Sequence, residues 1–355
     1  MKVKTKVCIV GTVGIPACYG GFESLVENLT LHKSESISYT VFCSSKSYSK
    51  KLVSHNNSKL HYIPLKANGA QSIFYDILSL IKCIFLKPDV VLILGVSGCI
   101  FLPIFSLFSN AKIVTNIDGL EWKRDKWSQL VKRFLKFSEK VAVKNSDVVV
   151  TDNKAIGHYV DQEYAKSNVT IAYGGDHAIR LGSFDTSSDT KNYALGLCRI
   201  EPENNVEMIL EAFSQLEYNL KFVGNWHSST FGKELKEKYG NMSNIELIDP
   251  IYDLDDLYRL RKGASLYLHG HSAGGTNPSL VEMMHFNIPI FAFDCSFNRY
   301  STDNSAHYFN GVEHLKNLVQ NTSNEELKVN AERMIFLAKQ YYVWDKIAKK
   351  YESTY

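Results

Sequence analysis

Short apolar runs alternate along this chain with segments whose apolar side chains recur every three to four positions. Runs of the first kind predict buried strands, and segments of the second kind predict helices. In the first half we predict a helix just after Gly21, helices at residues 73–86 and from Trp122 to about Lys144, and strands at residues 7–10, 39–43, 61–65, 89–94, 112–116, 147–151 and 169–173. In the second half we predict helices at residues 206–213 and 253–262 and after Asn277, and strands at residues 193–197, 220–223, 245–247, 265–268 and 290–294. Strands that alternate with helices predict a parallel sheet covered on both faces.

The pattern is interrupted once, at residues 183–191, which are polar and lack apolar periodicity. A chain of 355 residues is long enough for two cores. We therefore predict an α/β protein of two Rossmann-like domains that face a crevice. The predicted domains are residues 1–182 and residues 183–336, with a closing helix in residues 337–355 packed on the domain seam.

The composition is that of a globular protein, with 45% hydrophobic and 22% charged residues. A net charge of +3 gives no indication of nucleic-acid binding. The seven cysteines are odd in number and form no CxxC motif, which favours reduced core cysteines in a cytosolic protein. The apolar stretches at residues 73–86 and 99–108 are shorter than the roughly 20 residues that span a bilayer. We interpret them as core elements, or as elements with one face on a membrane surface.

The stretch after the strand at residues 265–268 carries the strongest candidate chemistry. Gly274 and Gly275 allow a close approach of the backbone to a ligand. Asn277 is a good N-cap, and Pro278 suits the first helical position. The free amides at such a helix start favour phosphate, and Glu282, one turn later, is placed to accept hydrogen bonds from ligand hydroxyls. An ordinary capped helix with a carboxylate near its start fits the same residues.

The N-terminal strand at residues 7–10 leads into a glycine-rich loop that contains Gly11, Gly14, Gly20 and Gly21. A strand, a glycine loop and a helix in this order indicate a nucleotide-binding type of fold. The spacing is not GxGxxG, and the strand at residues 39–43 ends without the acid that would hold an adenine ribose. These two features argue against a dinucleotide cofactor, and no cofactor is expected.

Three blocks resemble a known family: residues 11–23 (GTVGIPACYGGFE), 198–205 (CRIEPENN) and 270–282 (GHSAGGTNPSLVE). Together they resemble family 4 glycosyltransferases of the GT-B fold. Within that family the chain is similar to the rhamnosyltransferase subgroup that builds bacterial capsule and cell-wall polysaccharides. The resemblance implies transfer of a sugar, with retention, from a nucleotide-diphosphate donor in the C-terminal domain to an acceptor on the N-terminal domain.

The resemblance also assigns roles to single residues. Arg199 would contact the diphosphate, Glu282 the ribose, and the backbone near Ile251 the base. Asn204 stands where many relatives have a lysine, and Gly274 where they have a glutamate that touches the sugar; both departures fit the rhamnosyl subgroup. The donor-binding residues implied in this way are Gly14, Gly20, Gly21, Arg199, Asn204, Ile251, His271, Gly274, Gly275, Thr276, Asn277 and Glu282.

Several candidates have structural alternatives. Arg199 suits phosphate oxygens, but it also suits a surface ion pair with Glu201 or Glu203. Asp118 would orient or deprotonate an acceptor hydroxyl, or it would cap the helix that follows. Tyr173 would line the acceptor site or only turn the chain.

Metal binding has weak support in the sequence. His269 and His271 lack a placed third ligand, and two histidines alone are a poor indication of a metal site. The acids of Asp253-Leu254-Asp255 are better explained as the first turn of a helix. We therefore expect a metal-independent enzyme.

The segment from Trp122 to Lys140 has seven basic and two acidic residues, a net of five positive charges. Trp122, Trp127, Phe134 and Phe137 are interleaved with them, which is typical of an interfacial helix. Each cation near anionic lipid contributes on the order of 1 kcal/mol. We expect a peripheral enzyme on the inner face of the bacterial cytoplasmic membrane, bound to its anionic surface.

The expected substrates are a nucleotide-diphosphate sugar, with dTDP-rhamnose favoured, and a polyprenyl-diphosphate-linked saccharide. The catalytic residues are expected to be Asp118 and Arg199, and the acceptor-binding residues Asp118, Glu121, Trp122, Arg124 and Tyr173. A sugar-nucleotide epimerase of the same fold and an inactive nucleotide-sugar-binding protein remain alternatives.

Overall fold

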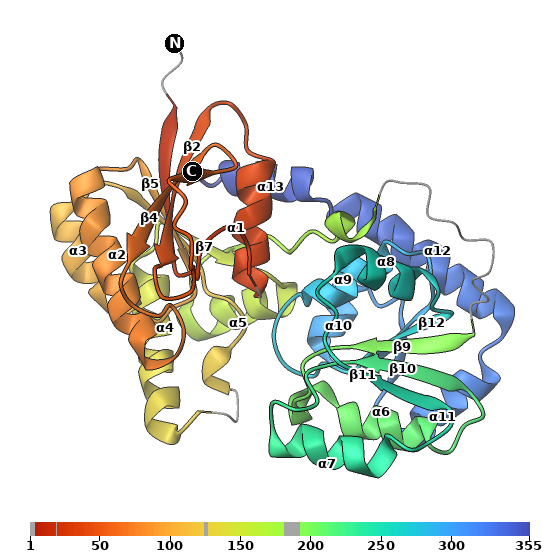
Figure 1. The fold of residues 1–355 in the computed structure, drawn as a ribbon. Coiled ribbons are helices and arrows are strands. Elements are labelled where there is room, and N and C mark those ends of the chain that lie inside the picture. Colours follow the sequence, from red (N-terminus) through yellow and green to blue (C-terminus); the bar gives the residue numbers. More distant parts are fainter. Residues whose placement is uncertain (1–3, 19, 124–126, 181–191) are drawn as a thin grey trace. The chain divides into compact units, whose positions relative to one another are not determined.

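The computed structural model describes residues 4–18, 20–123, 127–180 and 192–355. The chain forms two compact α/β units, shown in Figure 1. Unit 1 comprises Met1–Tyr173 and Trp344–Tyr355, and unit 2 comprises Gly174–Val343. The expected linker at residues 183–191 lies outside the described residues, as does Arg124.

Among the described residues, unit 1 contains an eight-stranded sheet with the order β3-β4-β2-β1-β5-β6-β7-β8. Its neighbouring strands pair in parallel except for the short β3–β4 pair. The strands are β1 (Thr5–Val10), β2 (Ile37–Ser44), β3 (Ser54–His55), β4 (Ser58–Ile63), β5 (Val90–Leu94), β6 (Lys112–Asn116), β7 (Val148–Thr151) and β8 (Val169–Thr170).

The helices of unit 1 cover both faces of this sheet. The chain first moves from β1 outward to β2 and β4, and then returns to build β5, β6, β7 and β8 on the other side of β1. Because parallel crossovers are right-handed, α1 lies on one face and the later crossover helices lie on the other. α13 packs beside α1, and α2, α3, α4 and α5 contact one another in turn. The helices are α1 (Gly21–Leu31), η1 (Gly69–Gln71), α2 (Ser72–Leu86), η2 (Cys99–Phe101), α3 (Leu102–Phe108), η3 (Glu121–Lys123), α4 (Gln129–Asn145), α5 (Lys154–Tyr164) and α13 (Trp344–Glu352).

Unit 2 contains a parallel sheet that has six strands among the described residues, in the order β11-β10-β9-β12-β13-β14. One part of its core surrounds Trp226, whose indole N–H donates to the carbonyl of Ile248 at 3.0 Å. The strands are β9 (Tyr193–Leu197), β10 (Asn219–Val223), β11 (Ile245–Ile248), β12 (Leu266–His269), β13 (Ile290–Phe293) and β14 (His307–Phe309). The helices are η4 (Asp176–Ala178), η5 (Pro202–Asn204), α6 (Val206–Phe213), α7 (Thr230–Tyr239), α8 (Leu254–Lys262), α9 (Pro278–Met284), α10 (Ser296–Ser301), α11 (Val312–Asn321) and α12 (Asn324–Tyr341).

The predicted class of two parallel-sheet α/β domains is confirmed, but the boundaries differ from those expected. Unit 2 begins at Gly174 instead of residue 183, and the expected closing helix is two helices that belong to different units. The break falls at Tyr342, whose carbonyl accepts hydrogen bonds from the Gly175 N–H at 2.8 Å and from His285 Nε2 at 2.9 Å. A carbonyl held in this way does not continue the helical ladder.

The C-terminal helix α13 completes the core of unit 1. Its apolar side chains Trp344, Ile347 and Tyr351 are buried. The Tyr351 hydroxyl accepts a hydrogen bond of 2.7 Å from the side-chain amide of Asn116, which is 1% exposed at the end of β6. The end of the chain therefore supports the loop that follows β6.

We predict that Tyr351→Phe destabilises the protein by about 1–3 kcal/mol, because the buried Asn116 amide loses its acceptor. Urea unfolding followed by tryptophan fluorescence measures this. Tyr252→Phe is the control, since Tyr252 is 78% exposed. Equal unfolding midpoints for the two variants would contradict the prediction.

Candidate active site

The candidate donor site of unit 2 is built from two loops at the carboxyl ends of neighbouring strands. β9 and β12 pair in parallel, so the loops that follow Leu197 and His269 leave the sheet at the same edge. The Ser272 N–H and hydroxyl both donate to the carbonyl of Glu203, at 3.0 and 2.8 Å. Asn205 Nδ2 donates to the carbonyl of Gly270 at 2.8 Å. These bonds clamp the two loops together.

Arg199 projects from the first of these loops and is partly exposed. Its guanidinium lies 3.6 Å from a carboxylate oxygen of Glu201, the ion pair expected of the structural alternative. An exposed pair of this kind contributes at most about 1 kcal/mol, so Arg199 remains able to exchange it for a stronger anion. Asn204 is buried, and its side-chain amide donates to the Arg199 carbonyl at 2.7 Å. Asn204 thus positions the Arg199 backbone, which was not expected from its sequence position.

The second loop depends on its glycines. A Cβ on Gly270 would lie 2.1 Å from the carbonyl oxygen of Asn204, so no larger residue fits where the two loops meet. Gly274 has a φ of +120° with open space around its Cα, which leaves its backbone accessible. Asn277 is the N-cap of α9 as predicted, with its side chain accepting from the Ser279 N–H at 3.1 Å.

Glu282 lies in a largely buried ion cluster. One carboxylate oxygen is hydrogen-bonded to the guanidinium of Arg261, from α8, and the other lies 3.2 Å from Nε2 of His177, from η4. Arg261 is 6% exposed, so the Arg261 guanidinium and the Glu282 carboxylate neutralise each other in the interior. Burial by itself would raise the pKa of Glu282, but Arg261 and His177 outweigh it and hold the pKa below its ordinary value. Glu282 is therefore ionised at neutral pH.

The two histidines of the glycine stretch stack on each other with ring centroids 4.4 Å apart. His269 is buried, and burial together with the neighbouring His271 lowers its pKa well below the ordinary value, so it is neutral. The described part of the chain holds no group of three or more His, Cys, Asp or Glu side chains placed for a metal ion. Asp253 caps α8, accepting from the N–H groups of Asp255 and Asp256 at 2.9 Å, as the helix-start interpretation predicts.

The remaining predicted donor residues of unit 2 differ in exposure. Ile251 is partly exposed in the loop after β11, and His271 and Gly275 are partly exposed in the clamped loop. Thr276 is 4% exposed. These positions stay predictions for donor contacts.

The glycine loop of unit 1 encloses a buried carboxylate. Glu23 accepts from the Thr12 hydroxyl at 3.0 Å and from the Val13 N–H at 2.7 Å. A Cβ on Gly20 would lie 1.7 Å from Glu23, and one on Gly14 would lie 2.5 Å from Cys43 Sγ. Gly20 and Gly14 are thus required by the packing of the loop, and Gly21 begins α1. A donor contact by these glycines stays a prediction.

Asp118 follows β6 and adopts a left-handed backbone conformation, with φ of 64°. Its N–H donates to Asn116 Oδ1 at 3.0 Å. The long helix after it begins at Gln129, later than predicted, and has Ser128 at its N-cap position, so Asp118 does not cap that helix. A strained, partly exposed carboxylate at a strand end is typical of a functional residue.

Tyr173 is 5% exposed, which places its ring in the interior of unit 1. Burial, and then the charges of Asp118 and Asp152, raise its pKa well above the ordinary value. Tyr173 therefore lies near both carboxylates, but its ring is less accessible than an acceptor-lining side chain was expected to be.

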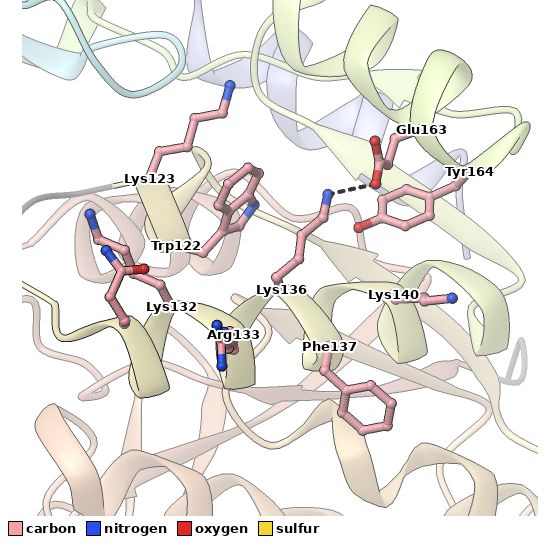
Figure 2. A pocket seen from close by; sticks show the side chains of 10 residues that line it. Trp122, Lys123, Lys132, Arg133, Lys136, Phe137, Lys140, Glu163 and Tyr164 are labelled. Atoms are coloured by element: carbon pink, nitrogen blue, oxygen red, sulfur yellow. Dashed lines mark ion pairs between the residues drawn. The ribbon is translucent and has the colours of Figure 1, made fainter.

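A basic depression of about 720 Å³ opens on unit 1 between η3, α4 and α5, and Figure 2 shows its lining. Lys136 extends in it toward Glu163, with a separation of 3.0 Å, and lies close to the rings of Trp122 and Tyr164. The residues that line the depression are Trp122, Lys123, Gln129, Lys132, Arg133, Lys136, Phe137, Lys140, Glu163 and Tyr164.

The floor of this basic depression is fixed by Glu139, which is 2% exposed. Its carboxylate accepts from Tyr159 at 2.5 Å, from Tyr164 at 2.6 Å and from the Trp122 indole at 3.1 Å. The Lys136 ammonium lies 3.6 Å away. Glu121, in turn, accepts from the Trp127 indole at 2.9 Å. The two predicted acceptor residues Glu121 and Trp122 are therefore held in place by hydrogen bonds.

Sequence reasoning missed His177, Arg261, Glu163 and Tyr164. His177 carries no sequence signal, because its partner Glu282 lies more than a hundred positions away. Glu163 and Tyr164 lie on α5, which was not predicted, although Ile156 and Val160 show its four-residue spacing. A helix assigned there would have brought the polar side of α5 next to α4.

Two family models match the chain. One, a domain of unknown function (DUF1972), covers residues 4–176, and the other, "Glycosyl transferases group 1", covers residues 183–346. No curated protein matches the sequence significantly.

Several solved structures share the architecture at low sequence identity. The sucrose-phosphate synthase from Thermosynechococcus elongatus has a TM-score of 0.81 and 12% identity over 99% of this chain and 98% of that one. Anabaena HepE in complex with UDP and glucose has a TM-score of 0.75 and 14% identity over 99% of each chain. A putative UDP-N-acetylglucosamine 2-epimerase from Listeria monocytogenes has a TM-score of 0.63 and 13% identity over 99% and 95%.

These likenesses show the fold, and the family model identifies the half of the chain that carries the clamped loops and Glu282. Residues 183–346 match the family model of glycosyl transferases group 1, and the chain has the two parallel-sheet α/β domains of the GT-B fold.

Proposed function

We propose that this protein transfers a sugar from a nucleotide-diphosphate donor held by unit 2 to an acceptor held by unit 1. One observation carries the proposal: in a glycosyl transferases group 1 domain, Arg199, an accessible glycine loop and an ionised Glu282 gather at the carboxyl edge of one parallel sheet. Ligands of open α/β sheets bind at that edge.

The chemistry follows from the charge of the leaving group. The bond between the anomeric carbon and the β-phosphate oxygen breaks, and the acceptor hydroxyl oxygen forms the new bond. The hydroxyl proton passes to the leaving phosphate, and a nucleoside diphosphate departs. Negative charge grows on the β-phosphate, and preorganised donors stabilise it. Arg199 and the backbone amides at Gly275, Thr276 and Asn277 supply those donors. Asp118 accepts a hydrogen bond from the acceptor hydroxyl and orients it.

Glu282 is suited to hold the ribose of the donor. Its pairing with Arg261 and His177 keeps the carboxylate charged and fixed in position while it is only 13% exposed. A carboxylate accepts hydroxyl hydrogen bonds through lone pairs that one guanidinium and one imidazole do not exhaust. His177 at 35% exposure marks the side from which a ligand reaches this cluster.

The donor we propose is dTDP-rhamnose, transferred with retention. The likeness to HepE in complex with UDP and glucose supports a nucleotide sugar in general. Rhamnose is supported by the resemblance to the rhamnosyl subgroup, in which Asn204 and Gly274 replace a lysine and a glutamate. Because Asn204 only supports the Arg199 backbone, phosphate binding would depend more heavily on Arg199 and the loop amides.

The acceptor we propose is a saccharide linked to polyprenyl diphosphate. The basic depression on unit 1 supports this, since its cations suit a diphosphate. The Listeria neighbour keeps a sugar-nucleotide epimerase as the second candidate. An epimerase acts on the nucleotide sugar alone and needs no such acceptor surface.

One experiment separates these functions. The protein is incubated with a panel of radiolabelled nucleotide sugars, with and without lipid extract. Transfer predicts label in the lipid fraction only when the extract is present. An epimerase would convert the nucleotide sugar without extract, and an inactive binding protein would retain the donor unchanged.

We predict that Arg199→Ala lowers transfer at least about a hundredfold and weakens donor binding, because one charge-stabilising donor is lost. Arg333→Ala is the matched control, since Arg333, on α12, forms a comparable surface ion pair with Asp303. Initial rates and donor titration calorimetry measure the two effects. Near-normal turnover of Arg199→Ala would remove Arg199 from the site.

We predict that Glu282→Gln weakens donor binding and also destabilises unit 2, because Arg261 loses its charged partner. The pKa of Glu282 lies below its ordinary value of 4.5, so its ionised form stabilises the fold above that pH. This contribution is lost as the pH falls through the folded-state pKa. The stability difference between wild type and Glu282→Gln is therefore expected to shrink on acidification.

Thermal melts across the acid range and donor titration on the folded fraction test both parts of this prediction. Glu234→Gln, an exposed carboxylate on α7, is the control and is expected to leave both unchanged. Unchanged donor affinity in folded Glu282→Gln would mean that Glu282 is structural only.

We predict that transfer survives EDTA. Arg199 and the loop amides are expected to carry the diphosphate charge, as the sequence led us to expect. Complete loss of activity, restored by manganese or magnesium, would contradict this.

A further inference from the structure

The helix layer α2–α3–α4 of unit 1 exposes an unusual number of large apolar side chains. Phe85 is 77% exposed and Leu107 is 78% exposed, values typical of charged surface residues. Because these helices pack on the same face of the sheet, their exposed sides point the same way, outward from it. The exposed apolar residues of the layer are Phe74, Leu78, Phe85, Leu86, Ile104, Leu107, Phe108, Leu130 and Phe137.

The helix α2 is apolar on both of its sides. Its inner side packs on β1 and β4 through Tyr75, Leu80 and Cys83. Gly69–Leu86 is the one segment among the described residues that is long and apolar enough to cross a membrane, with mean hydropathy 1.4, and 28% of it is buried. Because one side is occupied by the sheet, this helix is suited to lie along a membrane surface instead of crossing it. On its outer side Phe74, Phe85 and Leu86 are exposed.

The charges on the same layer all have one sign at the surface. The only acids in α2, α3 and α4 are Asp76 and Glu139, at 4% and 2% exposure. Every basic residue of the three helices is exposed or partly exposed. These are Lys82, Lys132, Arg133, Lys136, Lys140 and Lys144. On α4 cations and apolar residues share one exposed strip, made of Leu130, Arg133, Phe137, Lys140 and Lys144.

We propose that the outer face of α2, α3 and α4 docks on an anionic lipid bilayer, with its apolar side chains inserted and its cations among the lipid phosphates. Apolar residues flanked by cations, with no exposed acid on these three helices, complement both the apolar interior and the negative charge of such a bilayer. The inference deepens the proposed function, and rests on it only in placing the bilayer where a polyprenyl-linked acceptor resides. It places the protein on the cytoplasmic membrane face as a peripheral enzyme.

The docking surface differs from the one that sequence reasoning assigned. Trp122 and Trp127 were expected as interfacial anchors, but their indole N–H groups donate to Glu139 and Glu121. Lys123 and Lys136 also lie over the Trp122 ring. Trp122 is therefore part of the basic depression, and α2 and α3 supply the apolar anchors. Lys136 is part of the Glu139 network, so its substitution would test the fold as well as the surface.

The test is co-sedimentation of the full chain with vesicles, either of phosphatidylcholine alone or of phosphatidylcholine with phosphatidylglycerol. We expect binding only to the anionic vesicles, and weaker binding as salt rises. Phe85→Glu with Leu107→Glu should remove the apolar anchor. Arg133→Glu, Lys140→Glu and Lys144→Glu together should lower binding at least about tenfold.

The matched control reverses three exposed lysines on α13, Lys346, Lys349 and Lys350, on the opposite face of the same sheet. It should bind as wild type. Melting temperature and donor binding should be unchanged in all three variants. If the α2–α3 and α4 variants bind anionic vesicles as strongly as the wild type does, the proposal is overturned.

Two other occupants of this face are distinguishable. If sedimentation velocity shows a dimer that Phe85→Glu with Leu107→Glu dissociates, and vesicles are not bound, the face is a self-association interface and the proposal is wrong. Transfer in detergent without vesicle binding would reject the docking surface and leave the proposed function standing. Vesicle binding without transfer would support the docking surface and contradict the proposed function.

Discussion

A carboxylate buried away from water is tolerated only when it is paired, and this requirement organises the candidate donor site. Glu282 on α9, Arg261 on α8 and His177 on η4 come from three separate segments of unit 2. If one of these segments moves, the side chain that it carries is separated from the others. Breaking such a pair costs more than the pair itself contributes, because a charge is left uncompensated. The cluster therefore fixes α9, and with it the end of the glycine loop that precedes Asn277.

Unit 1 uses the same device at its own candidate site. Glu139 is fully buried and is satisfied by Tyr159, Tyr164 and Trp122, with Lys136 close by. This arrangement ties η3 and α5 to α4. The cations around it stay exposed or partly exposed, and one of them, Lys136, also pairs with Glu163. Because Glu139 is buried, basic side chains predominate on the surface around it.

The same inward placement of acids shapes the whole helix layer. With Asp76 and Glu139 buried, the outer surface of α2, α3 and α4 combines cations with large apolar side chains. Large apolar side chains gathered on one surface are unfavourable in contact with water. A lipid-linked acceptor and a membrane-docked enzyme would then meet at one interface, and diffusion in the plane of the bilayer would bring them together.

The sequence by itself determined the elements and much of the donor loops. β6, β9 and α6 match the predicted ranges, because short buried parallel strands and amphipathic helices are local patterns of apolar residues. The N-cap at Asn277 and the start of a helix at Asp253 were predicted for the same reason, since a helix start depends on neighbouring residues. The fold class follows from the alternation of these elements.

Tertiary structure alone decided which side chains share a site. Asn204 turned inward to the Arg199 carbonyl, Tyr173 became a core residue, and Tyr342 ended the predicted closing helix, each through a partner that the local sequence does not reveal. The pairing of Glu282 with Arg261 and His177 is of the same kind. Periodicity reports which side of an element is apolar, whereas a buried charge is satisfied by groups that folding brings from distant positions.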